Sequence, residues 1–301
     1  MRAVYVDRSS EMRDVMERRG PPVPPSVVIH DGNPSTADLI QYGRHAQVLI
    51  VERTRVDASV LDASRSLHTL IFMGTGAESY VDSVDAGRRG IRIITTPGYG
   101  DRAVAEHALA LLFCAARNIT RMDRDIRGGQ WFPLGGMQLQ GRKIAVIGLG
   151  GIGSAFAQIA TALGMRVAGW NRTPKDRPYF VRDLDTALQG SDAVSLHLAL
   201  NDETKSLIDD RRLGLPRPGY LLINTARAQL VKEQALLQAL ADGRVGHAAL
   251  DVFYNEPLFL PNAYSNLPNV TLTPHAAYLT DDACSELWRR ALEALTSLAP
   301  T

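Results

Sequence analysis

Short apolar runs alternate with stretches of helical periodicity throughout the first hundred residues. Runs of three or four mainly apolar residues predict buried strands, and they occur at 3–6, 27–29, 48–51, 70–73 and 91–94. Between them, 58–66 and 81–89 carry apolar residues at helical spacing. Because this alternation is typical of parallel strands joined by crossover helices, we expect an α/β fold.

A second series of strands begins at Lys143. Runs with strand character lie near 143–148, 166–170, 193–198, 220–224, 247–252 and 270–272. Before this series, a long apolar helix is expected over about 102–119, and a glycine- and aromatic-rich segment, 128–136, is too irregular for a helix. A last helix is expected over 281–298. With 301 residues, the chain is long enough for two domains.

Charge and cysteine content narrow the class of protein. The 33 Lys+Arg and 32 Asp+Glu residues leave a formal net charge of +1, which argues against nucleic acid or an anionic membrane as the main partner. Cys114 and Cys284 form neither a disulfide framework nor a metal motif, and no other cluster has metal-ligand spacing, so no metal is expected. No secretory signal is expected, and the longest apolar run, 108–116, is short of a membrane span. We expect a cytoplasmic protein.

A glycine-rich turn follows the first strand of the second series. Gly148, Gly150 and Gly153 form a GxGxxG motif between an apolar strand and a helical pattern, and Gly151 and Ile152 complete the loop. The first glycine permits a tight turn, the second lets a pyrophosphate approach the backbone, and the third lets helix and strand pack closely. The amino end of the helix supplies amide donors to phosphates. Strand, glycines, helix and second strand stand in the order that dinucleotide binding requires.

The end of the next strand bears on which dinucleotide is bound. NAD enzymes place a carboxylate there for the ribose hydroxyls, whereas this chain has Asn171, Arg172 and Thr173. A guanidinium can pair with a 2′-phosphate, which a carboxylate would repel. The motif therefore favours NADP (NADPH), with NAD possible. The alternative is an exposed basic loop in which Asp176 binds the ribose.

Three ionisable residues lie at or near strand ends in the second series: Arg227, Glu256 and His275. Carboxyl ends of parallel strands face the cofactor crevice, so we expect these side chains to converge there. Reduction of a 2-oxo acid needs a cation for the carboxylate, a proton donor for the carbonyl oxygen and a group that orients the donor. Arg227, His275 and Glu256 would fill these roles in turn, with Glu256 favouring the charged imidazole.

Together the motifs resemble the D-isomer-specific 2-hydroxyacid dehydrogenase family, and its NADP-using glyoxylate/hydroxypyruvate reductase members in particular. The matching stretches are 96–99, 104–109, 148–153, 224–227, 251–257 and 273–275. The resemblance implies that Arg227, Glu256 and His275 are the catalytic residues and that Asp251 meets the nicotinamide carboxamide. We add Thr225, Ala226 and Ala277 to the cofactor-binding residues.

The resemblance also bears on substrate and assembly. It implies that Thr75, Gly76 and Ala77 offer backbone amides to the substrate carboxylate, beside Arg227 and His275. It implies a homodimer. The helix over 104–116 either belongs to the core or packs on a twin subunit, and in the second case Trp131 and Phe132 would fill a partner surface. The loops 74–79 and 98–102 depart from the family's common pattern, so the substrate side chain is left open.

We therefore expect two Rossmann-like, doubly wound parallel-sheet domains with a cleft between them. The substrate domain would be discontinuous, 1–97 plus 280–301, and the dinucleotide-binding domain would occupy 98–279, with hinges near Pro97 and Tyr278. The expected reaction is NADPH-dependent reduction of a small 2-oxo acid, of the glyoxylate or hydroxypyruvate type, to the D-2-hydroxy acid. The alternatives are an NAD-linked dehydrogenase for a bulkier oxo acid and a dinucleotide-sensing, co-repressor-like regulator.

Overall fold

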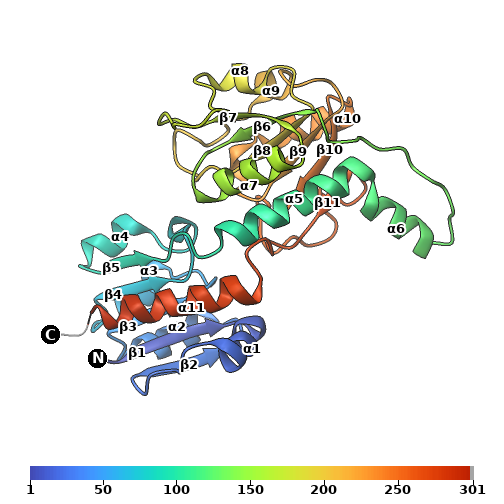
Figure 1. Cartoon of the computed structure of the whole chain (residues 1–301). Helices are drawn as coiled ribbons and strands as arrows, with labels where there is room; N and C mark the ends of the chain where they lie inside the picture. Colours follow the sequence, from blue (N-terminus) through green and yellow to red (C-terminus); the bar gives the residue numbers. More distant parts are fainter. Residues whose placement is uncertain (299–301) are drawn as a thin grey trace. The chain divides into compact units, whose positions relative to one another are not determined.

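The computed structural model describes residues 1–298 and divides the chain into two units (Figure 1). Unit 1 consists of Met1–Gly100 and the chain from Leu279 onward, and unit 2 consists of Asp101–Tyr278. The crossings predicted from the sequence, at 97/98 and 279/280, differ from these bounds by three residues and by one residue. Each unit is an α/β layer structure with a wholly parallel sheet, as the fold class predicted from the sequence requires.

Unit 1 is built on a five-stranded sheet in the order β2-β1-β3-β4-β5. Its strands are β1 (Ala3–Arg8), β2 (Val27–Asp31), β3 (Val48–Val51), β4 (Thr69–Phe72) and β5 (Arg92–Thr95). Its helices are α1 (Ser10–Arg19), α2 (Thr36–Gly43), α3 (Ala58–Ala63), the 3-10 turn η1 (Ala77–Ser79), α4 (Ser83–Arg88) and α11 (Asp281–Thr296).

Alternate residues of β1, β3 and β4 enter different cores, because successive side chains point to opposite faces. Val4 and Val6 pack with α2, α3 and α4, whereas Ala3 and Tyr5 pack with α1 and α11. Figure 1 shows α11, in red, beside the blue strands of this unit. Trp288 of α11 is fully buried, stacks on Tyr5 and donates a hydrogen bond to the Pro21 carbonyl oxygen at 3.0 Å. The end of the chain thus completes the domain with which the chain begins.

Unit 2 is built on a six-stranded sheet in the order β11-β10-β9-β8-β6-β7. Its strands are β6 (Lys143–Ile147), β7 (Arg166–Trp170), β8 (Ala193–Leu196), β9 (Tyr220–Asn224), β10 (Val245–Leu250) and β11 (Val270–Leu272). Its helices are α5 (Asp101–Arg117), α6 (Ile119–Arg127), α7 (Gly151–Ala162), α8 (Leu184–Leu188), α9 (Asp210–Leu213), the 3-10 turn η2 (Ala228–Leu230) and α10 (Glu233–Ala241).

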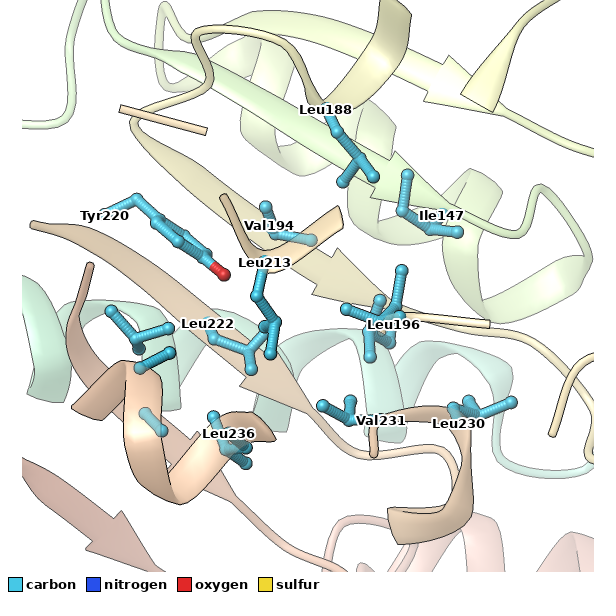
Figure 2. Close-up of a cluster of buried hydrophobic side chains, with 14 of the residues drawn as sticks. Ile147, Leu188, Val194, Leu196, Leu213, Tyr220, Leu222, Leu230, Val231 and Leu236 are labelled. Atoms are coloured by element: carbon cyan, nitrogen blue, oxygen red, sulfur yellow. The ribbon is translucent and has the colours of Figure 1, made fainter. Parts of the chain in front are cut away.

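Helices cover both faces of this second sheet. One face packs against α5 and α7, and the other packs against α8, α9 and α10. Figure 2 shows the second of these cores, where Leu188 and Leu236 from helices meet Val194, Leu196 and Leu222 from neighbouring strands. The apolar character of both strand faces explains why the strands read as continuous apolar runs in the sequence.

The strand order places a topological switch point in unit 2. From β6 the chain moves to β7 on one side and then returns to β8 on the other. In open parallel sheets, ligands bind at the carboxyl ends of the strands where the order reverses. Gly148, which follows β6, lies against His197, which follows β8, so the glycine motif stands at this switch point.

The helix expected over 102–119 was predicted too long. α5 ends at Arg117 because Asn118 adopts a left-handed conformation (φ 54°), and a separate helix, α6, follows. The Asn118 side chain donates to the Gly135 carbonyl oxygen at 2.7 Å, which ties this break to the glycine-rich segment. No helix within residues 1–298 combines the length and apolar character that a membrane span requires.

Candidate active site

Three neighbouring strands bring the predicted catalytic residues to one edge of unit 2. Arg227 follows β9, Glu256 follows β10 and His275 follows β11, and these strands are adjacent in the sheet. All three side chains therefore project from the carboxyl edge, on which the glycine motif also lies. The residues between each strand and its functional side chain form short loops with defined internal hydrogen bonds.

His275 and Glu256 form a hydrogen-bonded pair. The Nδ1 atom of His275 lies 2.7 Å from Oε2 of Glu256, and the other carboxylate oxygen accepts from the Phe253 amide at 2.8 Å. Burial raises the pKa of Glu256, but the hydrogen bond and charge of His275, the Phe253 amide and the charge of Arg227 outweigh it, so the pKa lies below its ordinary value. Glu256 is thus a carboxylate at neutral pH, and Nε2 is the ring nitrogen of His275 that can exchange a proton with a substrate.

The loop that carries His275 is held in a strained conformation. His275 itself has a positive φ of 53°, which is costly for a residue with a side chain. Asp251, fully buried at the end of β10, fixes this loop with both carboxylate oxygens: it accepts from the amides of Ala276 at 2.9 Å and Ala277 at 3.0 Å, and from the Thr273 hydroxyl at 2.5 Å. These bonds supply the constraint that keeps the imidazole in one orientation.

His107 of α5 joins the same group. Its Nε2 atom lies 3.1 Å from the Thr273 hydroxyl and 3.6 Å from the Asp251 carboxylate. His107 therefore connects α5 to the loop that carries His275.

A clamp formed by Asn224 sets the backbone before Arg227. The Asn224 side chain accepts from the Ala226 amide at 3.0 Å and donates to the Arg227 carbonyl oxygen at 2.9 Å. The Arg227 guanidinium donates to the Ala226 carbonyl oxygen at 2.7 Å. The charge of Arg227 reaches Glu256, so a cation, a carboxylate and an imidazole share this edge.

The glycine loop has the close contacts that exclude side chains at its first and third glycines. A Cβ on Gly148 (φ 101°) would lie 2.5 Å from the His197 carbonyl oxygen, and one on Gly153 would lie 1.8 Å from the Gly148 carbonyl oxygen. At Gly150, by contrast, a Cβ would meet nothing within 4 Å. Gly150 is also the amino cap of α7. The backbone at Gly150 is therefore open to the close approach that a pyrophosphate needs, while the Asp101 carboxylate lies against the next residue, Gly151.

A second observation supports the fit of a dinucleotide to this edge. The Thr225 hydroxyl, directly after β9, is buried, and none of the described residues forms a hydrogen bond with it. Buried hydroxyls are seldom left unpaired in folded proteins. The open backbone at Gly150 and the unpaired Thr225 hydroxyl thus fit a nicotinamide dinucleotide.

The loop after β7 makes contacts that the sequence did not predict. Asn171 accepts from the Leu149 amide at 3.0 Å and donates to the Thr173 carbonyl oxygen at 2.8 Å, so its amide group supports the glycine loop. Arg172 forms an ion pair with Glu203, and both side chains are largely exposed. The guanidinium expected to meet a 2′-phosphate already has an anionic neighbour.

The residues predicted to bind the substrate carboxylate through amides lie in unit 1. Thr75 and Gly76 follow β4, and Ala77 begins η1. Within residues 1–298, no group accepts a hydrogen bond from the amide of Thr75 or Gly76. Both donors are therefore available to an anion. Among the same residues, no cluster of three or more His, Cys, Asp or Glu side chains could hold a metal ion.

The model of the D-isomer-specific 2-hydroxyacid dehydrogenase NAD-binding domain matches residues 109–277. A glyoxylate reductase of Aeropyrum pernix is 34% identical over 281 residues, covering 88% of this chain and 84% of that protein. The chain belongs to this family. A hydroxypyruvate reductase of Thermotoga maritima is 32% identical, with 82% of each chain covered. Among solved structures, an acyclic imino acid reductase in complex with NADPH and D-Arg superimposes with a TM-score of 0.84 at 28% identity, over 99% of this chain and 96% of that chain.

Membership in the 2-hydroxyacid dehydrogenase family makes the protein an oxidoreductase with a nicotinamide dinucleotide cofactor. The sequence predicted that Arg227, Glu256 and His275 lie at one edge of the sheet, where the structure places them, but it gave no sign of the anchoring role of Asp251 or of the ion pair of Arg172. The Thr273–His275 motif and Asp251 are more than twenty residues apart, so no local pattern could have joined them.

Proposed function

We propose that this dehydrogenase reduces a small 2-oxo acid, of the glyoxylate or hydroxypyruvate type, to the D-2-hydroxy acid with NADPH. The observation that carries the proposal is the 2.7 Å pair of His275 and Glu256 beside Arg227. The glyoxylate and hydroxypyruvate reductases among the relatives support the substrate class.

Each side chain has one task in the proposed reaction. When bound, NADPH supplies the hydride that the carbonyl carbon accepts. Arg227 binds the substrate carboxylate and polarises the carbonyl group. His275 donates its Nε2 proton to the carbonyl oxygen and takes a proton back in the reverse direction, while Glu256 holds Nδ1 and stabilises the imidazolium. Asp251 acts through the loop, as a positioning residue.

Substrate and cofactor contacts beyond these residues follow from the same proposal. The amides of Thr75 and Gly76, together with Ala77, bind the substrate carboxylate from unit 1. Gly148, Gly153 and the loop between them bind the pyrophosphate of the cofactor. Asn171, Arg172 and Thr173 surround its 2′-phosphate, and Thr225, Ala226 and Ala277 contact the nicotinamide half. The contact with the nicotinamide carboxamide expected of Asp251 is replaced by its role in the loop, because Asp251 is fully buried.

An NAD-linked reaction with a bulkier oxo acid is the second candidate. The ion pair between Arg172 and Glu203 favours it, because Glu203 offsets the positive charge and would itself repel a 2′-phosphate. Against it, residues 171–173 contain no carboxylate for the ribose hydroxyls.

The test is oxidation of NADPH and of NADH, followed by absorbance, with glyoxylate, hydroxypyruvate, pyruvate and phenylpyruvate in parallel. We expect the highest kcat/KM with NADPH and one of the two small acids first named. Preference for NADH and phenylpyruvate would favour the second candidate. No turnover with any pair, by a protein that binds dinucleotide, would contradict both and favour a dinucleotide-sensing regulator.

We further propose a cytoplasmic homodimer in which α6 and the segment after it contact the partner. None of the α6 residues is buried, and Ile119, Ile126, Trp131 and Phe132 expose between 46% and 81% of their surface. Apolar side chains gathered on one segment at such exposure are typical of a protein interface.

A further inference from the structure

A polar pocket lies at the opposite edge of the unit 2 sheet from the candidate active site. Its lining comes from the segments that precede four adjacent strands or begin them: Gln138, Gln140, Gly141, Arg142, Arg166, Asp192 and Arg217. Its volume is about 390 Å³. Strands of five residues, such as β6, are about 16 Å long, so the pocket is separate from the glycine loop at their carboxyl ends.

Two of the three guanidinium groups that line this pocket share one carboxylate. The Nη1 atom of Arg142 lies 3.5 Å from Oδ1 of Asp192, and Nη1 of Arg217 lies 3.2 Å from the same oxygen. Arg166 uses only its Nε atom, which donates to the Gly141 carbonyl oxygen at 3.0 Å. Three positive charges therefore face one negative charge, and donors on each guanidinium remain available.

The Asp192 carboxylate is held in place by the backbone, so only one of its oxygens faces the arginines. It is 4% exposed, and its Oδ2 atom accepts from the Lys143 amide at 2.8 Å. Lys143 adds to the positive field nearby: burial lowers its pKa first, and the charges of Arg166 and Arg217 lower it further, whereas Asp192 raises it. Like charges held this close favour a counter-ion.

We propose that this pocket is a binding site for a small phosphate-bearing anion with two or more negative charges. Guanidinium groups match phosphate oxygens with paired hydrogen bonds, and Gln138 and Gln140 add neutral amide donors. The volume accommodates more than a single phosphate group. The proposal does not depend on the reaction catalysed at the other edge of the sheet.

Titration calorimetry with pyrophosphate, at fixed ionic strength, tests the proposal on the full chain. We expect saturable binding of pyrophosphate. The affinity should fall at least about tenfold in the double variant Arg166→Gln/Arg217→Gln, because each replacement removes a charge-assisted hydrogen bond to the anion. Arg65→Gln is the matched control: Arg65 is exposed in unit 1, and its replacement should leave the affinity unchanged.

A variant that binds more tightly excludes misfolding as the reason for weaker binding in the arginine variants. Asp192→Asn keeps an oxygen for the Lys143 amide but removes the competing charge, so pyrophosphate should bind at least about threefold more tightly. Absence of binding would overturn the proposal. Binding that is indifferent to all these replacements would also overturn it, and would place pyrophosphate at the glycine loop instead.

Discussion

At the residue scale, Asp101 is the least expected neighbour of the glycine loop. It is the first residue of α5, and a Cβ built on Gly151 would lie 1.7 Å from its Oδ2 atom. The carboxylate thus packs against the amino end of α7, where it interacts favourably with the helix dipole. A phosphate group approaching the same helix end would be repelled by this negative charge.

Replacing Asp101 by Asn should therefore tighten binding of NADPH and NADH to a similar extent, by a few-fold, because the pyrophosphate is common to both. The free protein should lose a little thermal stability, since the helix end loses its charge. Fluorescence titration with both dinucleotides measures the two dissociation constants. Weaker binding of both would show that Asp101 assists the cofactor.

Glu203 should act on only one of the two cofactors. In Glu203→Gln, Arg172 is released from its ion pair, and we expect NADPH to bind about two- to fivefold more tightly while NADH is unchanged, the modest size following from the exposure of the pair. The ratio of the two dissociation constants is the readout. An equal change for both cofactors would mean that Arg172 does not face the 2′-phosphate.

At the element scale, the ends of β1 and β3 are joined by two buried carboxylates. Asp7 accepts from the amides of Glu52, Arg53 and Thr54 at 2.7–2.8 Å and so fixes the turn after β3. Glu52 is 5% exposed, and its Oε2 accepts from the Tyr5 hydroxyl at 2.8 Å and the Ser9 amide at 3.1 Å. Burial is the main reason that its pKa is raised, and repulsion by Asp7 adds to it.

This raised pKa predicts a pH dependence of stability. Above pH 4.5, the ordinary pKa of a glutamate side chain, Glu52 has lost its proton in the unfolded chain but retains it in the folded protein. The free energy of unfolding therefore falls as the pH rises toward the raised pKa. Glu52→Gln keeps an acceptor and removes this dependence. The Tm of the variant relative to that of the wild type should therefore increase as the pH rises from 4.5 to 8. Parallel Tm curves for the two proteins would contradict the assignment.

The inner strands, such as β3 and β9, were predictable from sequence because both their faces are buried, which leaves uninterrupted apolar runs. α1 was not predicted because only Met12, Val15 and Met16 among its ten residues are buried. A functional motif that lies within one turn, such as the glycine motif over 148–153, could also be predicted. The Arg172–Glu203 pair spans 31 positions and depends on the folding of two separate loops, so the sequence held no local signal for it.

At the scale of the whole molecule, the proposed assembly rests on the exposed apolar segment over 119–136. Replacing Trp131 and Phe132 together by Ser should convert a dimer to a monomer in size-exclusion chromatography with light scattering. Both side chains are largely exposed in the single chain, so circular dichroism should not change. A monomeric wild type, or a variant that stays dimeric, would rule out this interface.

In the proposed reaction, His275, held by Glu256, transfers the proton. The most direct measurement compares His275→Ala with the wild type, in kcat with the best oxo acid and in the dissociation constant for NADPH. We expect kcat to fall by about 10²–10⁴-fold, the usual contribution of a general acid, with the dissociation constant unchanged within about twofold. A variant that retains turnover, or a folded one that loses turnover and NADPH binding to the same extent, would contradict the claim.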